Sequence, residues 1–342
     1  MITQPEFSVI TGAQVSAVLR GQEEAVVELV RRTYLEHEAG RTVNPPSYFL
    51  TFPEAPRNRI IALPAALTGP DGTSGLKWIS SFPANIEREL PRASAVTILN
   101  DAETGYPQAC LESSIISAAR TAASAVLGAA ALSANRPRPT RLGLVGAGVI
   151  NRYIHRYLQA TGWQFDEVRV HDLAPERAAD FCALLADRGE RDPQVAGDAE
   201  DLIRTSDLVV FATVAPTPHV TDPAWFDHHP LVLHISLRDL GPEVIRSGQN
   251  IVDDVDHVLK AQTSVHLVEQ ADGDRDFIDG TLAQVLTGAV TPAADRTIVF
   301  SPFGLGVLDL ALARFIHTAS RATGAQHDIP DFFHDLNRLD RA

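Results

Sequence analysis

Lysine and cysteine are both scarce in this sequence of 342 residues. Lys77 and Lys260 are the two lysines, and arginine supplies the rest of the 29 basic residues. A lysine kept within an apolar stretch is therefore a candidate for a specific role. The cysteines, Cys110 and Cys182, form no CxxC pair, which argues against a disulfide framework and a structural zinc site. Since the sequence also shows no secretory-signal pattern, we expect a cytoplasmic protein that binds no metal.

Positive charge is also in short supply. The 43 acidic residues outweigh the 29 basic ones, and the formal net charge is −14. Sequence-independent binding to nucleic acid or to an anionic membrane depends on positive charge, so we expect neither partner. The longest apolar run, 115–134, is interrupted by Arg120 and is rich in alanine. It therefore predicts a buried helix rather than a membrane span.

The first part of the chain mixes helix and strand patterns. Apolar residues recur at helical spacing over 23–37, and Gly40 follows as a stop signal. Short apolar stretches between turn residues predict antiparallel strands at 60–66, 75–79 and 94–99. An alanine-rich helix over 112–134 then runs into the proline-containing segment 136–140, the clearest domain boundary by composition. This part is predicted to be α+β.

Beyond residue 140 the pattern alternates between strand and helix. A helical pattern at 150–160 is accompanied by β-rich runs at 141–145, 167–171, 208–213 and 231–235. Such alternation predicts an α/β fold with a Rossmann-type doubly wound parallel sheet. A last helical pattern, 305–323, is expected to return to the first domain.

A glycine-rich turn joins the first of these later strands to its helix. Gly146 would allow a tight turn, and Gly148 would let the backbone approach a pyrophosphate at the helix N-terminus. Asp172 ends the next strand, where a carboxylate binds the ribose hydroxyls of an adenosine, and this favours NAD as cofactor. Asn151 replaces the third glycine of the usual pattern, and a purely structural turn is the alternative. The expected cofactor contacts are Gly146, Gly148, Val149, Ile150 and Asp172.

Cations within apolar stretches are candidate substrate ligands in the first domain. These are Arg59, Lys77, Arg92 and Arg120. A buried charge needs a partner, and the carboxylate of a ligand would supply one. The alternative for each is a local Asp or Glu, or an exposed position. Lys77 and Arg120 have the flanks most typical of burial.

Two strand ends in the second domain carry further candidates. Ligands of doubly wound sheets bind beyond the carboxyl ends of the strands, so Asp239, just after the strand 231–235, is placed to act as an acid/base group. A helix N-cap is the alternative role for Asp239. Thr213 follows another strand and is a candidate for cofactor contact.

Several of these segments together resemble the ornithine cyclodeaminase/mu-crystallin family. The resemblance runs over nearly the whole chain and rests on Gly75-Leu76-Lys77-Trp78, Ser81–Asn85, Leu99–Gly105, Arg120–Ala123 and Gly146-Ala147-Gly148. Longer strings at Arg59–Ala65, Ser114–Ala123 and Ser301–Asp309 resemble one branch, the N-[(2S)-2-amino-2-carboxyethyl]-L-glutamate dehydrogenases. That branch makes 2,3-diaminopropionate for siderophores and peptide antibiotics.

The resemblance implies a homodimer in which each chain has two domains with separate roles. A substrate-binding and dimerisation domain would cover 1–121 and 302–342, and an NAD-binding domain would cover 122–301. By position, Lys77 and Arg120 would hold a substrate carboxylate, with Lys77 also counted as catalytic, and Asp239 would be the acid/base residue. Asp172 would bind the adenosine ribose, and Thr213 and Ser236 would touch the cofactor.

The resemblance also implies the reaction. Family cyclodeaminases have an arginine at the place of Ser47, a lysine at that of Glu243 and a threonine at that of Arg92. These differences argue against ornithine as the substrate. They favour an acidic, amino-acid-derived substrate bound by Arg59, Lys77, Arg92 and Arg120. The expected activity is NAD-dependent oxidative hydrolysis of N-[(2S)-2-amino-2-carboxyethyl]-L-glutamate. The alternatives are an ornithine cyclodeaminase, a ketimine reductase and a non-catalytic mu-crystallin-like binding protein.

Overall fold

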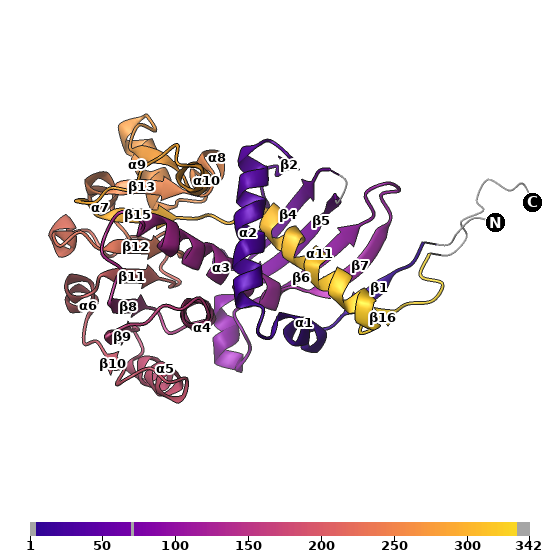
Figure 1. Cartoon of the computed structure of the whole chain (residues 1–342), viewed down its shortest axis with the longest axis horizontal. Coiled ribbons are helices and arrows are strands. Elements are labelled where there is room, and N and C mark those ends of the chain that lie inside the picture. Colours follow the sequence, from indigo (N-terminus) through magenta and orange to yellow (C-terminus); the bar gives the residue numbers. More distant parts are fainter. Residues whose placement is uncertain (1–4, 70–71, 334–342) are drawn as a thin grey trace, which may run out of the picture. The chain divides into compact units, whose positions relative to one another are not determined.

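The computed structural model describes residues 5–69 and 72–333, and its contacts divide the chain into two units. The first unit holds the residues up to Arg120 together with those from Leu305 onward, and the second spans Thr121–Gly304. Both ends of the expected first domain, 1–4 and 334–342, lie outside the described residues. In Figure 1 the first unit therefore contains indigo elements from the start of the chain and yellow ones from its end.

The first unit is built on a mostly antiparallel sheet. Its strands follow the order β16-β1-β7-β6-β5-β4-β2, and β3 also pairs with β4. The predicted strands at 60–66, 75–79 and 94–99 are confirmed as parts of β4, β5 and β6, which pair antiparallel. The bounds are β1 Ser8–Ile10, β2 Thr42–Val43, β3 Tyr48–Thr51, β4 Arg59–Leu67, β5 Thr73–Ser81, β6 Ala93–Asn100, β7 Pro107–Glu112 and β16 His327–Asp328.

Helices cover one face of this sheet. Helix α11 packs on β4, β5 and β6 and also on α2, which buries Val26, Val30 and Tyr34 at the spacing of one helical face (Figure 1). The predicted helices at 23–37 and 305–323 are confirmed as α2 and α11. The bounds are α1 Gly12–Leu19, α2 Glu23–Glu38, η1 Pro83–Arg88 and α11 Gly306–Thr323.

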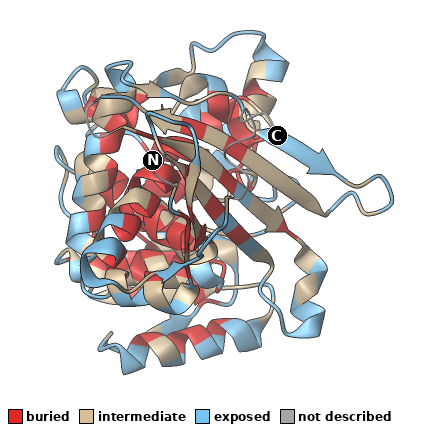
Figure 2. Cartoon of the chain, turned by 90° about the vertical axis from the view of Figure 1, so that its right-hand side faces the viewer, coloured by how far each residue is buried: buried red, intermediate tan, exposed pale blue. Residues whose placement is uncertain are grey.

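The other face of the sheet exposes apolar side chains. Every residue of β3 is exposed, and Figure 2 shows exposed and half-buried strand residues beside the buried ones. The strand registers Tyr48↔Ala62, Ala62↔Trp78 and Trp78↔Val96 place these residues on one face. The side chains of Tyr48, Trp78 and Val96 remain exposed there.

The second unit is a parallel sheet in the doubly wound order. The strands run β10-β9-β8-β11-β12-β15-β13-β14, and the order reverses direction between β8 and β11. The predicted Rossmann-type fold is therefore confirmed. The strand bounds are β8 Arg141–Val145, β9 Glu167–His171, β10 Gln194–Val195, β11 Leu208–Phe211, β12 Leu231–His234, β13 Gln249–Val252, β14 Ile278–Thr281 and β15 Ile298–Ser301.

Short helices connect the strands of the second unit. Their bounds are α4 Val149–Ala160, α5 Pro175–Asp187, α6 Ala199–Thr205, η2 Pro223–Phe226, α7 Pro242–Ser247, α8 Val255–Val258, α9 Ser264–Asp272 and α10 Leu282–Thr287. Strand β11 ends at Phe211, so Thr213 lies in the loop after the strand rather than at its last position.

Helix α3, Ser114–Leu132, contains the boundary between the units, which therefore does not lie at the proline-containing segment 136–140. The reason is packing: Gly128 lies against Phe300 of β15, where an added Cβ would be 2.7 Å from the ring. Glu112 ends β7 instead of starting this helix, and its carboxylate accepts hydrogen bonds from the backbone N–H groups of Ser114 and Ile115. By length and composition α3 could cross a membrane, but 72% of its apolar window is buried within the protein.

Candidate functional site

The glycine turn after β8 has the geometry of a dinucleotide-binding loop. Gly146 has a φ of +97°, and a Cβ added there would lie 2.6 Å from the carbonyl oxygen of Ala212, so only glycine fits. Gly148 is the N-cap of α4, and a Cβ added there would meet no atom within 4 Å. This open space at a helix N-terminus, with its unpaired N–H groups, suits a pyrophosphate. The residues present therefore fit NAD.

Asn151 has a structural task in this loop. Its side chain is buried, and Nδ2 donates hydrogen bonds to the carbonyl oxygens of Val145 at 3.0 Å and Gly146 at 2.6 Å. The amide therefore ties α4 to the turn where the usual pattern has a third glycine. This explains the departure that the sequence pattern left open.

Asp172 lies beside the same loop. Its Oδ2 accepts a hydrogen bond from the Ala147 N–H at 2.8 Å, and its Oδ1 accepts one from the Ala174 N–H at 3.0 Å. Each carboxylate oxygen keeps a second lone pair, so the ribose contact expected from the sequence is still available. The neighbouring Leu173 is 97% exposed, and Val149 and Val214 are also exposed. Exposed apolar side chains at strand ends suit the flat faces of a dinucleotide's rings.

Asp239 is the centre of a polar cluster beyond the carboxyl end of β12. The side chain is fully buried, and the hydroxyls of Thr213 and Ser236 donate to its two carboxylate oxygens. His219 Nε2 lies 3.2 Å from Oδ1, and the Asp239 backbone N–H donates to His234 Nε2 at 3.1 Å. The N-cap alternative for Asp239 is wrong, because Gly241 caps α7.

Two opposing effects set the charge of Asp239. Burial acts to raise its pKa, but the hydrogen bonds from His219 and Ser236, together with the nearby His234 ring, outweigh burial and hold the pKa well below the ordinary range of an aspartate. Asp239 is thus an ionised carboxylate at neutral pH. It can accept a proton briefly but releases it readily.

The backbone next to Asp239 is strained. Leu237 is buried and has a φ of +68°, a left-handed conformation that a branched residue adopts only when its surroundings enforce it. Its carbonyl oxygen accepts a hydrogen bond from the Ser264 N–H at 2.7 Å.

His219 and His234 were missed at the sequence level. Neither lies in a motif, and their contacts with Asp239 come from folding of the loops after β11 and β12. Thr213 and Ser236 were expected to touch the cofactor. Their hydroxyls bind Asp239, and their contact with the cofactor stays a prediction.

In the first unit, Lys77 and Arg120 share a carboxylate that the sequence did not point to. Lys77 Nζ lies 2.6 Å from Asp309 Oδ2, and Arg120 Nε lies 3.1 Å from Asp309 Oδ1. All three are buried. The Lys77–Arg120–Asp309 cluster thus combines two cations with one anion. Burial lowers the pKa of Lys77 to about 8, with Arg120 adding to the effect and Asp309 opposing it.

Arg59 and Arg92 form a second cationic group in this unit, the Arg59–Arg92 pair. Arg92 Nη1 donates to Ser81 Oγ at 2.6 Å, and Ser81 is paired with Arg59 across β4 and β5. Burial lowers the pKa of both guanidinium groups, and the charge of Arg59 lowers that of Arg92 further. Within 5–69 and 72–333, neither arginine has a carboxylate at ion-pair distance, and Arg59 Nε is buried without an acceptor. Two adjacent half-buried cations without an anion are suited to bind one.

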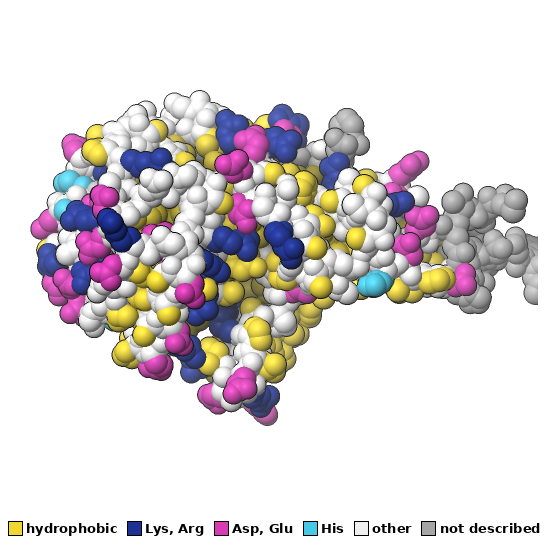
Figure 3. All heavy atoms as spheres, turned by 60° about the horizontal axis from the view of Figure 1, so that its bottom comes forward, with side chains coloured by type: hydrophobic (Ala, Val, Ile, Leu, Met, Phe, Trp, Pro, Cys, Tyr) yellow, Lys and Arg dark blue, Asp and Glu magenta, His cyan; other side chains and the backbone are white. Residues whose placement is uncertain are grey.

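The described part of the chain holds no candidate metal site. Among these residues, no group of three or more His, Cys, Asp or Glu side chains lies close enough to hold a metal ion. Charged side chains of both signs share the face drawn in Figure 3.

Comparison with known proteins agrees with this geometry. The sequence pattern of the ornithine cyclodeaminase/mu-crystallin family matches residues 9–324. N-((2S)-2-amino-2-carboxyethyl)-L-glutamate dehydrogenase of Staphylococcus aureus is 30% identical over 270 residues, which are 76% of this chain and 78% of that protein.

Two solved structures have the same fold. One is Δ(1)-pyrroline-2-carboxylate reductase of Thermococcus litoralis with NADH and L-proline, at a TM-score of 0.86 and 23% identity, covering 94% of this chain and all of that one. The other is an archaeal alanine dehydrogenase dimer with bound NAD. Its TM-score is 0.84 and its sequence identity 24%, and the match covers 96% of this chain and 100% of that one. With the loop geometry, these findings confirm the prediction of NAD as cofactor. The chain therefore belongs to the ornithine cyclodeaminase/mu-crystallin family.

Proposed function

We propose that this protein is an NAD-dependent oxidoreductase acting on the CH–NH group of N-[(2S)-2-amino-2-carboxyethyl]-L-glutamate. The products would be L-2,3-diaminopropionate and 2-oxoglutarate. The reaction balances as substrate, NAD⁺ and water giving these two products, NADH and one proton. The diaminopropionate would serve the biosynthesis of a siderophore or a peptide natural product.

The observation that carries this proposal is the surplus of buried and half-buried cations in the first unit. The Lys77–Arg120–Asp309 cluster keeps one net positive charge, and the Arg59–Arg92 pair has two. A substrate with three carboxylates would neutralise charges that ornithine, with one carboxylate and a second amino group, would leave unpaired. Charge-assisted hydrogen bonds of this kind contribute about 1.5–3 kcal/mol each.

The second unit would supply the dinucleotide site and a group for proton transfer. When bound, NAD accepts a hydride from the α-carbon of the glutamate part of the substrate. Gly146 and Gly148 would admit the pyrophosphate, and Asp172 would bind the adenosine ribose. Asp239, held ionised by its hydrogen bonds, would take a proton from the attacking water as the imine is hydrolysed.

The outer face of the first sheet supports a homodimer. Tyr48, at 71% exposure, lies with Leu50, Trp78 and Val96 on one face of paired strands, and such a contiguous apolar face is typical of an interface. A second copy of the chain is the proposed occupant, because the archaeal alanine dehydrogenase of the same fold is a dimer. We place this dimer in the cytoplasm. Light scattering should give twice the monomer mass for the wild-type protein. The Trp78→Glu variant should give a mass closer to that of one monomer.

Product analysis tests the activity. Purified protein with substrate and NAD should form NADH, 2-oxoglutarate and diaminopropionate in equal amounts, measured by absorbance and mass spectrometry. Ornithine converted to proline and ammonia without net NADH would instead identify a cyclodeaminase. Oxidation of NADPH with a cyclic imine would identify a ketimine reductase, and ligand binding without any turnover would identify a binding protein.

A pair of variants tests the role of the arginines. Arg59→Gln and Arg92→Gln should each raise KM for the substrate by about 10- to 100-fold, the equivalent of one charge-assisted hydrogen bond. Arg41→Gln is the matched control, since Arg41 is exposed and pairs with Glu36 in the same unit. An unchanged KM in both test variants would remove the Arg59–Arg92 pair from the substrate site.

A further inference from the structure

Among the described neighbours of Asp239, His219 is both titratable and open to solvent. We infer that His219 carries protons between Asp239 and the solvent during turnover, as a relay and positioning residue. The inference rests on the proposed function, in which each turnover releases one proton. His219 Nε2 lies 3.2 Å from Asp239 Oδ1, a distance across which a proton can pass.

The main chain sets the position of this histidine. The backbone N–H groups of His219 and Val220 both donate to the Asp239 carbonyl oxygen at 2.9 Å. The Gly241 N–H donates to the Val220 carbonyl oxygen at 2.8 Å, and Val220 pairs with Leu240 in a parallel bridge. The loop after β11 is thus joined to the segment that carries Asp239. The imidazole is held beside the carboxylate by this short ladder, not by a flexible contact.

Burial separates His219 from the other partners of Asp239. The side chain of Asp239 is 0% exposed, whereas that of His219 is 44% exposed. The ring therefore extends from a closed carboxylate to the solvent. His234 is itself fully buried, and its Nε2 already accepts the Asp239 backbone N–H. Thr213 and Ser236 offer hydroxyls, which do not change charge near neutral pH.

The chemistry of the proposed reaction needs such a route. Oxidation of the secondary amine to the imine releases the amine N–H proton. Water then adds to the imine carbon, and both of its protons end on the nitrogen as the C–N bond breaks and the carbonyl forms. The one proton that must leave the site in each turnover is therefore the one released by the amine. A carboxylate as acidic as Asp239 passes a proton on readily, and an imidazole can accept a proton on one ring nitrogen and release one from the other.

The test compares three histidine variants in the complete protein. His219→Ala should lower kcat at least about tenfold, within the range typical of acid–base groups, without changing NAD binding by calorimetry. Added imidazole should restore much of that rate, because the vacated position is open to solvent, but should not rescue Asp239→Asn. His219→Gln should keep the hydrogen bond to Asp239 and still be slow. His228→Gln is the matched control, since His228 is exposed in the same unit and bonds only the Ser206 carbonyl oxygen among the described residues.

Proton release gives a second readout. In single-turnover reactions with a pH indicator, the wild-type protein should release its proton in step with product formation, and His219→Ala should release it later. A wild-type rate in His219→Ala, or no effect of imidazole, would overturn the relay alone. Failure of the wild-type protein to form NADH from the substrate would overturn the proposed function, and the relay with it.

Discussion

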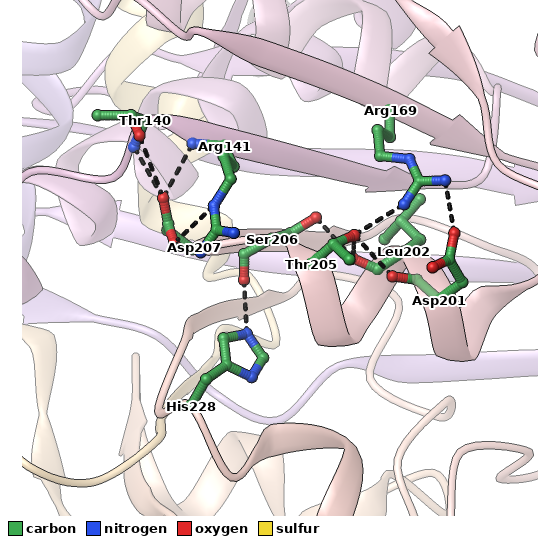
Figure 4. Close-up of polar contacts among 9 residues, drawn as sticks. All are labelled: Thr140, Arg141, Arg169, Asp201, Leu202, Thr205, Ser206, Asp207 and His228. Atoms are coloured by element: carbon green, nitrogen blue, oxygen red, sulfur yellow. Dashed lines mark hydrogen bonds and ion pairs between the residues drawn. The ribbon is translucent and has the colours of Figure 1, made fainter.

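The two edges of the parallel sheet in the second unit use charged residues in opposite ways. At the amino edge, before β8 and β11, Asp207 accepts hydrogen bonds from the Arg141 guanidinium, the Arg141 N–H and the Thr140 N–H and hydroxyl (Figure 4). Arg169 likewise binds Asp201 and Thr205 of α6. Opposite charges at this edge satisfy one another.

At the carboxyl edge, neither Asp172 nor Asp239 pairs with an arginine or lysine of the described part of the chain. Asp239 is surrounded by hydroxyls and imidazoles, and Asp172 accepts hydrogen bonds from the backbone N–H groups of Ala147 and Ala174. Exposed apolar side chains and the strained Leu237 lie at the same edge. Charge that is neutralised by an opposite charge stabilises a fold, whereas charge held by hydroxyls, imidazoles and backbone N–H groups remains available to a ligand. We therefore expect the amino edge to contribute to stability, and we propose the carboxyl edge as the place of the chemistry.

The largest effect should come from Asp239→Asn. Asparagine preserves the shape but cannot accept a proton, so kcat should fall by roughly 10²- to 10⁴-fold. Steady-state NADH formation measures this. Asp207→Asn, the equivalent change at the amino edge, should leave kcat close to that of the wild type. Equal losses in both variants would contradict the assignment of the two edges.

Asp172→Ser should weaken binding of the cofactor without changing the rate of the chemical step. Loss of the ribose contact should raise KM for NAD about tenfold or more, and removal of the carboxylate should allow NADP to compete. The ratio of kcat/KM for the two cofactors measures this change. An unchanged ratio would show that Asp172 serves the loop alone, through Ala147 and Ala174.

The dependence of KM on pH should show that Lys77 is the group that loses its charge at alkaline pH. Asp239 is ionised throughout the neutral range, whereas the Lys77 ammonium, with its pKa of about 8, loses its charge above that pH. KM for the substrate should therefore rise about tenfold per pH unit above 8 as the cation is lost. Lys77→Arg should move this rise in KM to higher pH. If the rise stays at the same pH in Lys77→Arg, another group causes it.

The same pKa has a consequence for stability. An unfolded lysine keeps its proton up to about 10.5, so between pH 8 and 10.5 the folded protein binds fewer protons than the unfolded chain. The contribution of Lys77 to the free energy of unfolding should therefore increase as the pH rises from 8 to 10.5. Denaturant titrations of the wild type and Lys77→Met at several pH values would measure the difference.

The smallest effect on activity should come from Asp207→Ala. Loss of its hydrogen bonds should lower the free energy of unfolding by about 1–3 kcal/mol, measured by denaturant titration. At 25 °C kcat should stay within twofold of the wild type. A large loss of kcat in a folded variant would place the amino edge in the catalytic machinery.

Much of the fold could be predicted because its signals are local. The apolar spacing of α2, the alternation of strands and helices after residue 140 and the glycines at 146 and 148 depend on neighbours in sequence. The boundary inside α3 could not be predicted in this way, since contact between Gly128 and Phe300 decides it. The motifs also indicated Lys77, Arg120 and Asp239 as candidates, but not what surrounds them.

The sequence by itself determined the fold class, the dinucleotide loop and the set of unusual cations, because backbone conformation and hydrophobic periodicity are short-range properties. Tertiary structure alone decided the electrostatics. Asp309 neutralises Lys77 from 232 positions away, and His219 reaches Asp239 through a ladder between two loops. Charge and pKa depend on which groups share a buried space, and only the folded chain brings those groups together.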